Sequence, residues 1–461
     1  MMPARSLTRQ VAEFASALTY ADLPAGVVHV AKRLTLDTLG CALAATALND
    51  GCRPVIEVMT RLGGRPESTI VGSTLKVCAP NAAFANGALA NALNFDAAGV
   101  DVGHTGVASL AAPLALAEAR APVSGRRFLT AVVLAAELTT RMSLASAAVR
   151  HTGPERLLLS GQYFGYLPAA AAAGHIVKLQ PAAMQSALGL ALMQVSGSRQ
   201  VIVQGDPPAK AIYGGFPSHA GVLGALLAEA GLGAEIDALD GGAGFYALVG
   251  GAFDRDLFID GLGTSFRLLE ATFKPWATSG VVTPFIEAAV EVATRHDMQA
   301  AQIASVELLM SPRLRQWCEP VAERRHPGNG ASAANSIIFP TVKALAHRTV
   351  TLADFTADGL RDDDALALAD RTTCSFDERI RGGLVRVRTM AGDDLTAAVE
   401  TPLGYPSRPI SDDFLRAKFR DCCSFVPALS EDDVDALIAF VDRLELAGDV
   451  SPLAVPALLH S

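Results

Sequence analysis

The stretch Phe128-Leu-Thr-Ala-Val-Val-Leu-Ala-Ala-Glu-Leu138 decides the fold class of this 461-residue chain. Its apolar residues recur at intervals of three and four, which places them on one stripe of an α-helix. Half of all residues are hydrophobic but only 6% are aromatic, so Ala, Leu and Val must fill the interior, as in closely packed helices. The same pattern, interrupted by Gly, Pro or Asn, continues from Leu7 to about Leu262 and predicts helices at 24–45, 81–93, 125–148, 181–195 and 217–230.

The pattern changes around Ser265, where β-branched alternating runs stand beside helices. Residues 303–310 and 384–390 read as strands, and a turn at 391–394 leads into 395–401 to complete a hairpin. Helices return after 402–406, and the spacing of Ser430 and Asp433 is that of a capping box. We therefore predict a mainly α protein. A large all-helical domain (1–264 and 405–461) carries a smaller α+β domain (265–404) inserted late in the chain, as the length also favours.

Charge and hydropathy restrict the partners. A net charge of −9 and a pI near 5.5 disfavour nucleic acid and anionic membranes. The mean hydropathy of +0.31 is high, yet the apolar stretches 128–138 and 166–174 fall short of the roughly 18–20 residues of a membrane span. We read them as buried helices and expect no membrane partner, a cytoplasmic location because residues 1–10 lack an apolar signal region, and a homodimer that buries the surplus apolar surface.

Missing signatures remove several reaction classes. The seven cysteines include no C-x-x-C spacing, which argues against a disulfide framework and a zinc site. The chain has no P-loop, no G-x-G-x-x-G after a strand, no G-x-S-x-G elbow and no H-E-x-x-H. We therefore expect neither a cofactor nor a metal.

The segment with the clearest chemical content is Ala85-Asn-Gly-Ala-Leu-Ala-Asn-Ala-Leu-Asn-Phe-Asp96, followed by His104 and the apolar run 110–118. A helix that ends in polar residues, then a Gly-containing loop with one His, then another helix can project side chains into a cleft.

At this point the chain resembles the MmgE/PrpD family, which includes 2-methylcitrate dehydratase, cis-aconitate decarboxylase and iminodisuccinate epimerase. Further stretches match in the same order along essentially the whole chain: 34–43, Phe164-Gly165 with 169–174, Lys210 with Gly215, Ala220 and Gly221, Phe273-Lys274-Pro275-Trp276 and Leu403-Gly404-Tyr405-Pro406. No single motif is specific, but the ordered set is. The resemblance implies two domains, a dimer, and a cofactor-free site between the domains.

The chain departs from the family pattern at several polar positions. Asn94 and Ala98 stand where the family often has Asp and Thr, and Leu159 and Thr283 stand where it has His. Phe339 stands where it has Tyr. These changes make 2-methylcitrate itself an unsuitable substrate and leave open whether activity is redirected or lost.

Three candidate catalytic residues survive: His104, Lys210 and Lys274. A cationic pair can hold a substrate carboxylate and stabilise enolate-like charge, and a neutral imidazole can remove or return an α-proton. Asn94, Asp96, Tyr213 and His219 are candidate substrate-binding residues. Two tyrosines, Tyr163 and Tyr213, are candidate acids, and the Arg324-Arg325-His326 segment reads first as a solvated loop.

These residues favour a cofactor-free lyase or isomerase that acts on a small di- or tricarboxylic acid by α-proton abstraction, of dehydratase or decarboxylase type. One alternative is an epimerase or racemase of a dicarboxylate, with His104 and Lys210 as opposed bases. A second is a non-catalytic binding homologue that retains the cleft.

Overall fold

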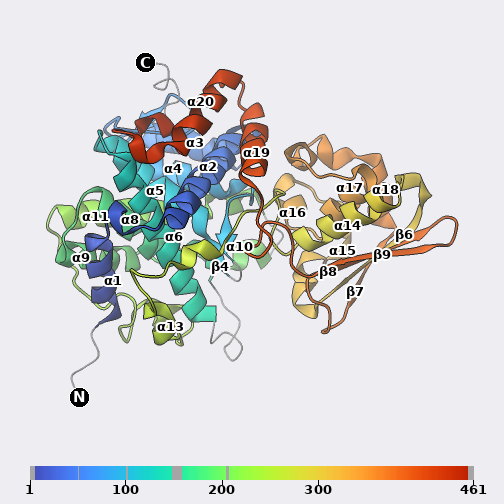
Figure 1. The fold of residues 1–461 in the computed structure, drawn as a ribbon, viewed down its shortest axis with the longest axis horizontal. Helices are drawn as coiled ribbons and strands as arrows, with labels where there is room; N and C mark the ends of the chain where they lie inside the picture. The colour runs from blue at the N-terminus through green and yellow to red at the C-terminus, as the bar shows by residue number, and fades with distance from the viewer. Residues whose placement is uncertain (1–5, 50, 100–101, 148–157, 204–206, 455–461) are drawn as a thin grey trace.

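The computed structural model describes residues 6–49, 51–99, 102–147, 158–203 and 207–454. Figure 1 shows a large helical body, coloured blue to green, beside a smaller body of sheet and helices, coloured yellow to red. The prediction of a mainly α protein is confirmed. The helices are α1 (Leu7–Ala17), α2 (Ala25–Leu48), α3 (Cys52–Leu62), α4 (Ala79–Ala92), α5 (Thr105–Ala119), α6 (Gly125–Ala147), α7 (Ser160–Tyr163), α8 (Tyr166–Ile176), α9 (Pro181–Leu192), α10 (Gln200–Val203), α11 (Gly215–Glu229), α12 (Phe245–Val249), α13 (Arg255–Ile259), α14 (Thr283–Arg295), α15 (Val321–Arg325), α16 (Gly330–Ala334), α17 (Ile338–His347), α18 (Asp363–Asp370), α19 (Asp412–Ser424) and α20 (Glu431–Asp442), with a 3-10 helix η3 (Pro208–Gly214) before α11.

Small residues let the helices of the large body approach closely. The alanines 169–173 of α8 are fully buried. A Cβ at Gly221 of α11 would lie 2.6 Å from the carbonyl carbon of Ala169, so the two helices meet backbone to backbone. This contact explains why a chain with few aromatic residues still forms a dense core.

The smaller body is built on a four-stranded sheet in the order β7-β6-β8-β9. β6 pairs in parallel with β7 and antiparallel with β8, and the β8–β9 hairpin is the predicted one. Buried positions alternate along β6 and β8, α14 covers the buried face, and α17 packs on α14. The strands of the chain are β1 (Ser68–Thr69), β2 (Lys76–Val77), β3 (Ala98–Gly99), β4 (Val102–His104), β5 (Ala271–Thr272), β6 (Ile303–Met310), β7 (Thr372–Phe376), β8 (Gly383–Thr389) and β9 (Asp394–Val399).

The C-terminal helices pack on the large body. Phe419 of α19 is buried in the same apolar core as α2, and a Cβ at Gly40 would lie 2.9 Å from its ring. Figure 1 shows α19 and α20, in red, and both helices pack on α2. A separate core spans residues 282–399. The domain limits at 264/265 and 404/405 stay a prediction.

Predicted and observed elements agree within a few residues. The helix predicted at 24–45 is α2, and the strand predicted at 303–310 has those bounds. The Ser430–Asp433 capping box is present, although α20 ends at Asp442 rather than 446. Residue 148, the predicted end of the helix that begins at Gly125, lies outside the described residues.

Two helical segments are longer and more apolar than the stretches 128–138 and 166–174 that were considered as membrane spans. Gly125–Ser146 and Pro208–Glu229 could cross a membrane by length and composition alone. Within the fold, however, 94% and 67% of their most apolar 18-residue windows are buried. This burial is typical of core helices in a compact protein.

Candidate active site

A three-stranded sheet in the order β4-β3-β5 joins distant parts of the chain. Ala98 in β3 lies opposite both His104 in β4 and Thr272 in β5. The Thr272 hydroxyl donates to the Ala98 carbonyl at 2.9 Å. This hydrogen bond holds β5 against β3, and Lys274 lies two residues after β5. Two candidate catalytic residues that are 170 positions apart in sequence are thereby placed at one cavity.

His104 stands directly before α5 and is held by hydrogen bonds on both ring nitrogens. Its Nδ1 lies 2.9 Å from each Asp96 carboxylate oxygen, and its Nε2 lies 2.9 Å from the Tyr213 hydroxyl. Because a carboxylate only accepts hydrogen bonds, Nδ1 carries the proton and Nε2 accepts from the phenol. The side chain of Asp96 is fully buried, whereas 15% of the His104 side chain remains exposed, on the cavity side.

Asp96 thereby orients the imidazole. It also accepts a hydrogen bond from the Asn91 amide at 3.2 Å. The predicted substrate-binding role of Asp96 finds no support in its position, because its side chain is fully buried and its residue does not line the cavity. A carboxylate that accepts a hydrogen bond from one ring nitrogen fixes the tautomer of the imidazole. It also stabilises the imidazolium that forms when the other nitrogen takes a proton.

The surroundings adjust the pKa values of the base and of the nearest cation. Burial and the positive charges of Lys274 and Lys210 lower the pKa of His104, although Asp96 opposes them. Burial and Lys418 lower the pKa of Lys274 to about 8, although Asp96 again opposes them. At neutral pH the imidazole is thus available as a base while Lys274 keeps most of its charge.

Lys274 is bonded to Asn94. Its Nζ donates to the Asn94 carbonyl at 2.7 Å and to the side-chain Oδ1 at 3.1 Å. Asn94 adopts a left-handed backbone conformation, with φ at 53°, a region in which Asn is among the more readily accommodated residues. The Asn94 amide orients the ammonium group without neutralising its charge.

The cavity beside these residues has a volume of about 360 Å³. Besides His104, its wall includes Lys210, Lys274 and Arg324, and no Asp or Glu is among the described residues that line it. Arg324 is buried and donates to the carbonyls of Gln316 and Asn335 at 3.0 and 3.2 Å. This electrostatic pattern suits an anionic ligand. Arg324 is thus a buried wall residue, not part of a solvated loop, whereas His326 lies outside and contacts Asp370.

Lys418, which was not predicted from the sequence, holds together the backbone segments that carry the site. Its Nζ donates to Asp37 Oδ1 at 2.6 Å, to the Phe95 carbonyl at 2.8 Å and to the Lys274 carbonyl at 3.0 Å. It also lies 3.6 Å from the centre of the Phe95 ring. Burial alone would lower the pKa of Lys418, but Asp37, Cys41 and Cys422 together raise it above its ordinary value. Helix α19 is thereby tied to α2 and to both segments that carry the site.

Gly404 allows the turn at 403–406 to pack against the backbone next to Lys274. Gly404 has a φ of 94°, and a Cβ there would lie 2.1 Å from the Phe273 carbonyl oxygen. The Phe273 amide also donates to the Gly404 carbonyl at 3.0 Å. The turn therefore packs directly on the backbone that precedes Lys274, which only glycine allows.

Not every sequence-predicted residue reaches this cavity. Tyr213 and Lys210 line it, as do three of the departures from the family pattern, Ala98, Leu159 and Thr283. His219 lines a different cavity, of about 310 Å³, together with Phe84 and Phe216. Phe339 and Tyr163 are buried elsewhere and do not line the cavity of His104.

No group of three His, Cys, Asp or Glu side chains positioned to hold a metal ion occurs among the described residues.

Comparison with known proteins identifies the relatives of this chain. Residues 9–257 match the model of the MmgE/PrpD N-terminal domain, and residues 276–446 match that of the MmgE/PrpD C-terminal domain. The chain belongs to the MmgE/PrpD family. The C-terminal family domain includes α19 and α20, although these helices pack on the large body.

Relatives of known name cover nearly the whole chain. A cis-aconitate decarboxylase of Aspergillus terreus is 25% identical over 97% of this chain and 95% of its own length. A cis-aconitate decarboxylase-like protein of Aspergillus oryzae is 25% identical, over 98% and 97%. The cis-aconitate decarboxylase of Mus musculus is 24% identical, over 98% and 93%.

Proposed function

We propose that this protein is a cofactor-free lyase of the decarboxylase type that acts on a small di- or tricarboxylic acid. One observation carries the proposal: the Asp96, His104 and Tyr213 side chains form a hydrogen-bonded chain at the wall of a cavity that also presents Lys210, Lys274 and Arg324. We further propose that it works as a homodimer in the cytoplasm.

The first step is removal of an α-proton. Neutral His104 takes the proton at Nε2, either directly, once substrate has displaced the Tyr213 hydroxyl, or through that hydroxyl as a relay. Asp96 then stabilises the imidazolium. The electron pair moves onto the substrate carboxylate as an enolate-like anion. The ammonium groups of Lys210 and Lys274 stabilise this charge in a largely buried setting.

The second step decides the reaction type. In a decarboxylase, the imidazolium first returns the proton to another carbon of an unsaturated acid, which shifts the double bond. The bond to a carboxylate then breaks, its electron pair forms a new double bond, and the displaced pair takes a proton from water as carbon dioxide leaves and hydroxide remains. In a dehydratase, a β-hydroxyl group leaves instead. The decarboxylase is favoured because the relatives over the whole chain length carry that name. Ala98 and Leu159 make the cavity wall less polar than the family pattern, so the substrate is expected to differ from 2-methylcitrate.

The test is a screen of small di- and tricarboxylates in deuterated water that follows carbon dioxide release and deuterium incorporation together. We expect a decarboxylated, deuterium-labelled product from at least one acid. Deuterium in recovered substrate without loss of carbon dioxide or water would instead indicate an epimerase. Binding without any exchange would indicate a non-catalytic homologue.

Two histidine variants give a matched comparison. His104→Ala should lower turnover by about 100-fold to 10,000-fold, the usual contribution of a general base, with little change in binding. His219→Ala removes the same kind of side chain from the separate cavity and should leave turnover within about twofold. Equal effects of both variants would contradict the assignment of His104.

A further inference from the structure

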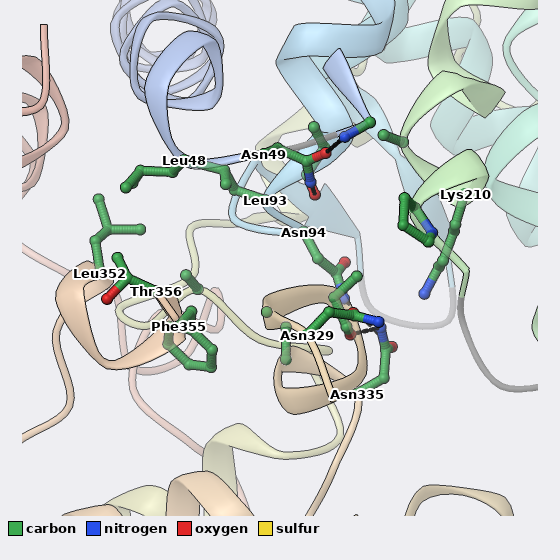
Figure 2. A pocket seen from close by; sticks show the side chains of 18 of the residues that line it. Leu48, Asn49, Leu93, Asn94, Lys210, Asn329, Asn335, Leu352, Phe355 and Thr356 are labelled. Atoms are coloured by element: carbon green, nitrogen blue, oxygen red, sulfur yellow. Dashed lines mark hydrogen bonds between the residues drawn. The ribbon is translucent and has the colours of Figure 1, made fainter. Parts of the chain in front are cut away.

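A second cavity adjoins the catalytic one. Its volume is about 340 Å³, and it lies between the ends of α2 and α4 on one side and α16 with residues 352–360 on the other. The catalytic cavity has almost the same volume, about 360 Å³. Four residues line both: Asn94, Lys210, Tyr213 and Asn335. Figure 2 shows Asn94 and Asn335 side by side within this shared wall, with Lys210 reaching toward them.

The two cavities differ in charge. The catalytic cavity presents Lys210, Lys274 and Arg324, whereas Lys210 at the junction is the sole Lys, Arg, His, Asp or Glu among the described residues that line the second cavity. Apolar side chains form much of the rest: Leu48, Leu93, Leu352, Phe355 and Leu360. A charged group would lose hydration there without gaining a partner away from the junction, so the second cavity favours an uncharged group.

The amides of the second cavity have partners within the protein. Asn49 donates to the Ala92 carbonyl and accepts from the Gly51 amide, both at 2.9 Å. Asn329 accepts from the Ser332 amide at 2.9 Å. At the junction, Asn335 donates to the Ala331 carbonyl at 2.9 Å. An apolar ligand group can therefore enter without breaking these hydrogen bonds, and burying it is favourable.

We infer that the substrate is an elongated carboxylic acid. Its carboxylates occupy the catalytic cavity, and an uncharged, largely apolar chain passes the junction of Asn94, Lys210, Tyr213 and Asn335 into the second cavity. Each cavity is near the lower limit of the roughly 300–1,000 Å³ typical of small-molecule sites, so the two together hold a ligand larger than either. This inference rests on the proposed function for the nature of the charged end.

Three glycines allow the cavities to be filled one at a time. Gly328 lines the second cavity and Gly280 the catalytic one, and a Cβ at either position meets nothing within 4 Å. Gly242 is equally open but lines neither cavity. None of the three has a positive φ, so a side chain introduces no backbone strain. The variants Gly328→Phe, Gly280→Phe and Gly242→Phe thus make the same change at three sites.

The probes are succinate and butylsuccinate, and the readout is affinity by calorimetric titration. Burying one methylene contributes about 0.8 kcal/mol, or about fourfold in affinity, so burying half of the butyl group, two carbons, should make butylsuccinate bind about 15-fold more tightly than succinate. We expect Gly328→Phe to abolish this preference while leaving the affinity for succinate within about twofold. Gly280→Phe should weaken both acids, and Gly242→Phe neither. Thermal unfolding checks that each variant is folded.

Each other outcome is decisive. Equal affinity of the native protein for both acids, or a preference that survives Gly328→Phe, would overturn the inference. Failure of both acids to bind at 10 mM would overturn it together with the anionic assignment of the catalytic cavity. Because affinity is measured without turnover, a preference without turnover of any acid contradicts the proposed function alone. Turnover without a preference contradicts only the elongated substrate.

Discussion

The buried Lys418–Asp37 pair provides a quantitative test of how the site is held. The exposed fractions of the two side chains are 3% and 0%, and Lys418 Nζ has three oxygen partners at 2.6–3.0 Å. Lys418→Met keeps most of the aliphatic stem but leaves Asp37 as an unpaired buried carboxylate. We expect the free energy of unfolding to fall by about 3–5 kcal/mol, the usual effect of breaking a buried ion pair.

The magnitude has two sources that can be separated. One is the unpaired charge of Asp37. The other is the loss of a donor for the carbonyls of Phe95 and Lys274, since a buried polar group without a partner costs about 1–3 kcal/mol. Adding Asp37→Asn to Lys418→Met removes the first source and leaves the second. The double variant should therefore recover at least about 2 kcal/mol of the loss, on the scale of an uncompensated buried charge.

Urea denaturation followed by circular dichroism measures these differences. Lys32→Met is the matched control, because Lys32 on α2 also forms an ion pair with a C-terminal residue, Glu445, but this pair lies nearer the surface. Its loss should stay below about 1 kcal/mol, as for other exposed pairs. The reasoning would be refuted if Lys418→Met were as mild as Lys32→Met, or if Asp37→Asn gave no recovery.

Three further predictions concern the site and the assembly. In a pH profile, kcat/KM should fall at a pH below the ordinary pKa of histidine, because His104 gains a proton. It should also fall near pH 8, because Lys274 loses a proton there. His104→Ala should remove the fall on the acid side. Asn94→Asp places a carboxylate against Lys274, so titration should show anionic acids binding about 1–3 kcal/mol more weakly. Sedimentation should show a dimer, and a monomer alone at micromolar concentration would contradict this.

The elements were largely predictable because their signals are local. The helices α2 and α6 and the strand β6 follow from apolar periodicity within one window of sequence. β7 was not predicted, because Thr372-Thr-Cys-Ser-Phe376 lacks a clear alternation and its parallel partner β6 lies over 60 residues earlier. Pairing with a distant strand leaves little trace in a short sequence.

The site was predictable only in part, for geometric reasons. Tyr213 lies in the 3-10 helix η3, whereas His219 lies in the second turn of α11 and lines another cavity with Phe84 and Phe216. Lys418 could not be found at all, since it is one lysine on an amphipathic helix and its partner Asp37 is 381 residues away. His104, Lys210 and Lys274 were found through the matched motifs rather than through any local physical signal.

The positions at which the chain departs from the family pattern help to choose between a lyase and a non-catalytic binding homologue. A protein that only binds an anion needs the cations of the cavity, but it gains nothing from a fully buried Asp96 behind His104, because burying a carboxylate is unfavourable unless a partner uses its charge. The acid–base chain is intact, while the altered positions Ala98, Leu159 and Thr283 lie on the cavity wall, where a bound ligand would meet them. We expect changes at the wall to alter which acid is accepted. Together with a second cavity whose charge is limited to Lys210 at the junction, these changes favour a lyase with a less polar substrate over a homologue that has lost its chemistry.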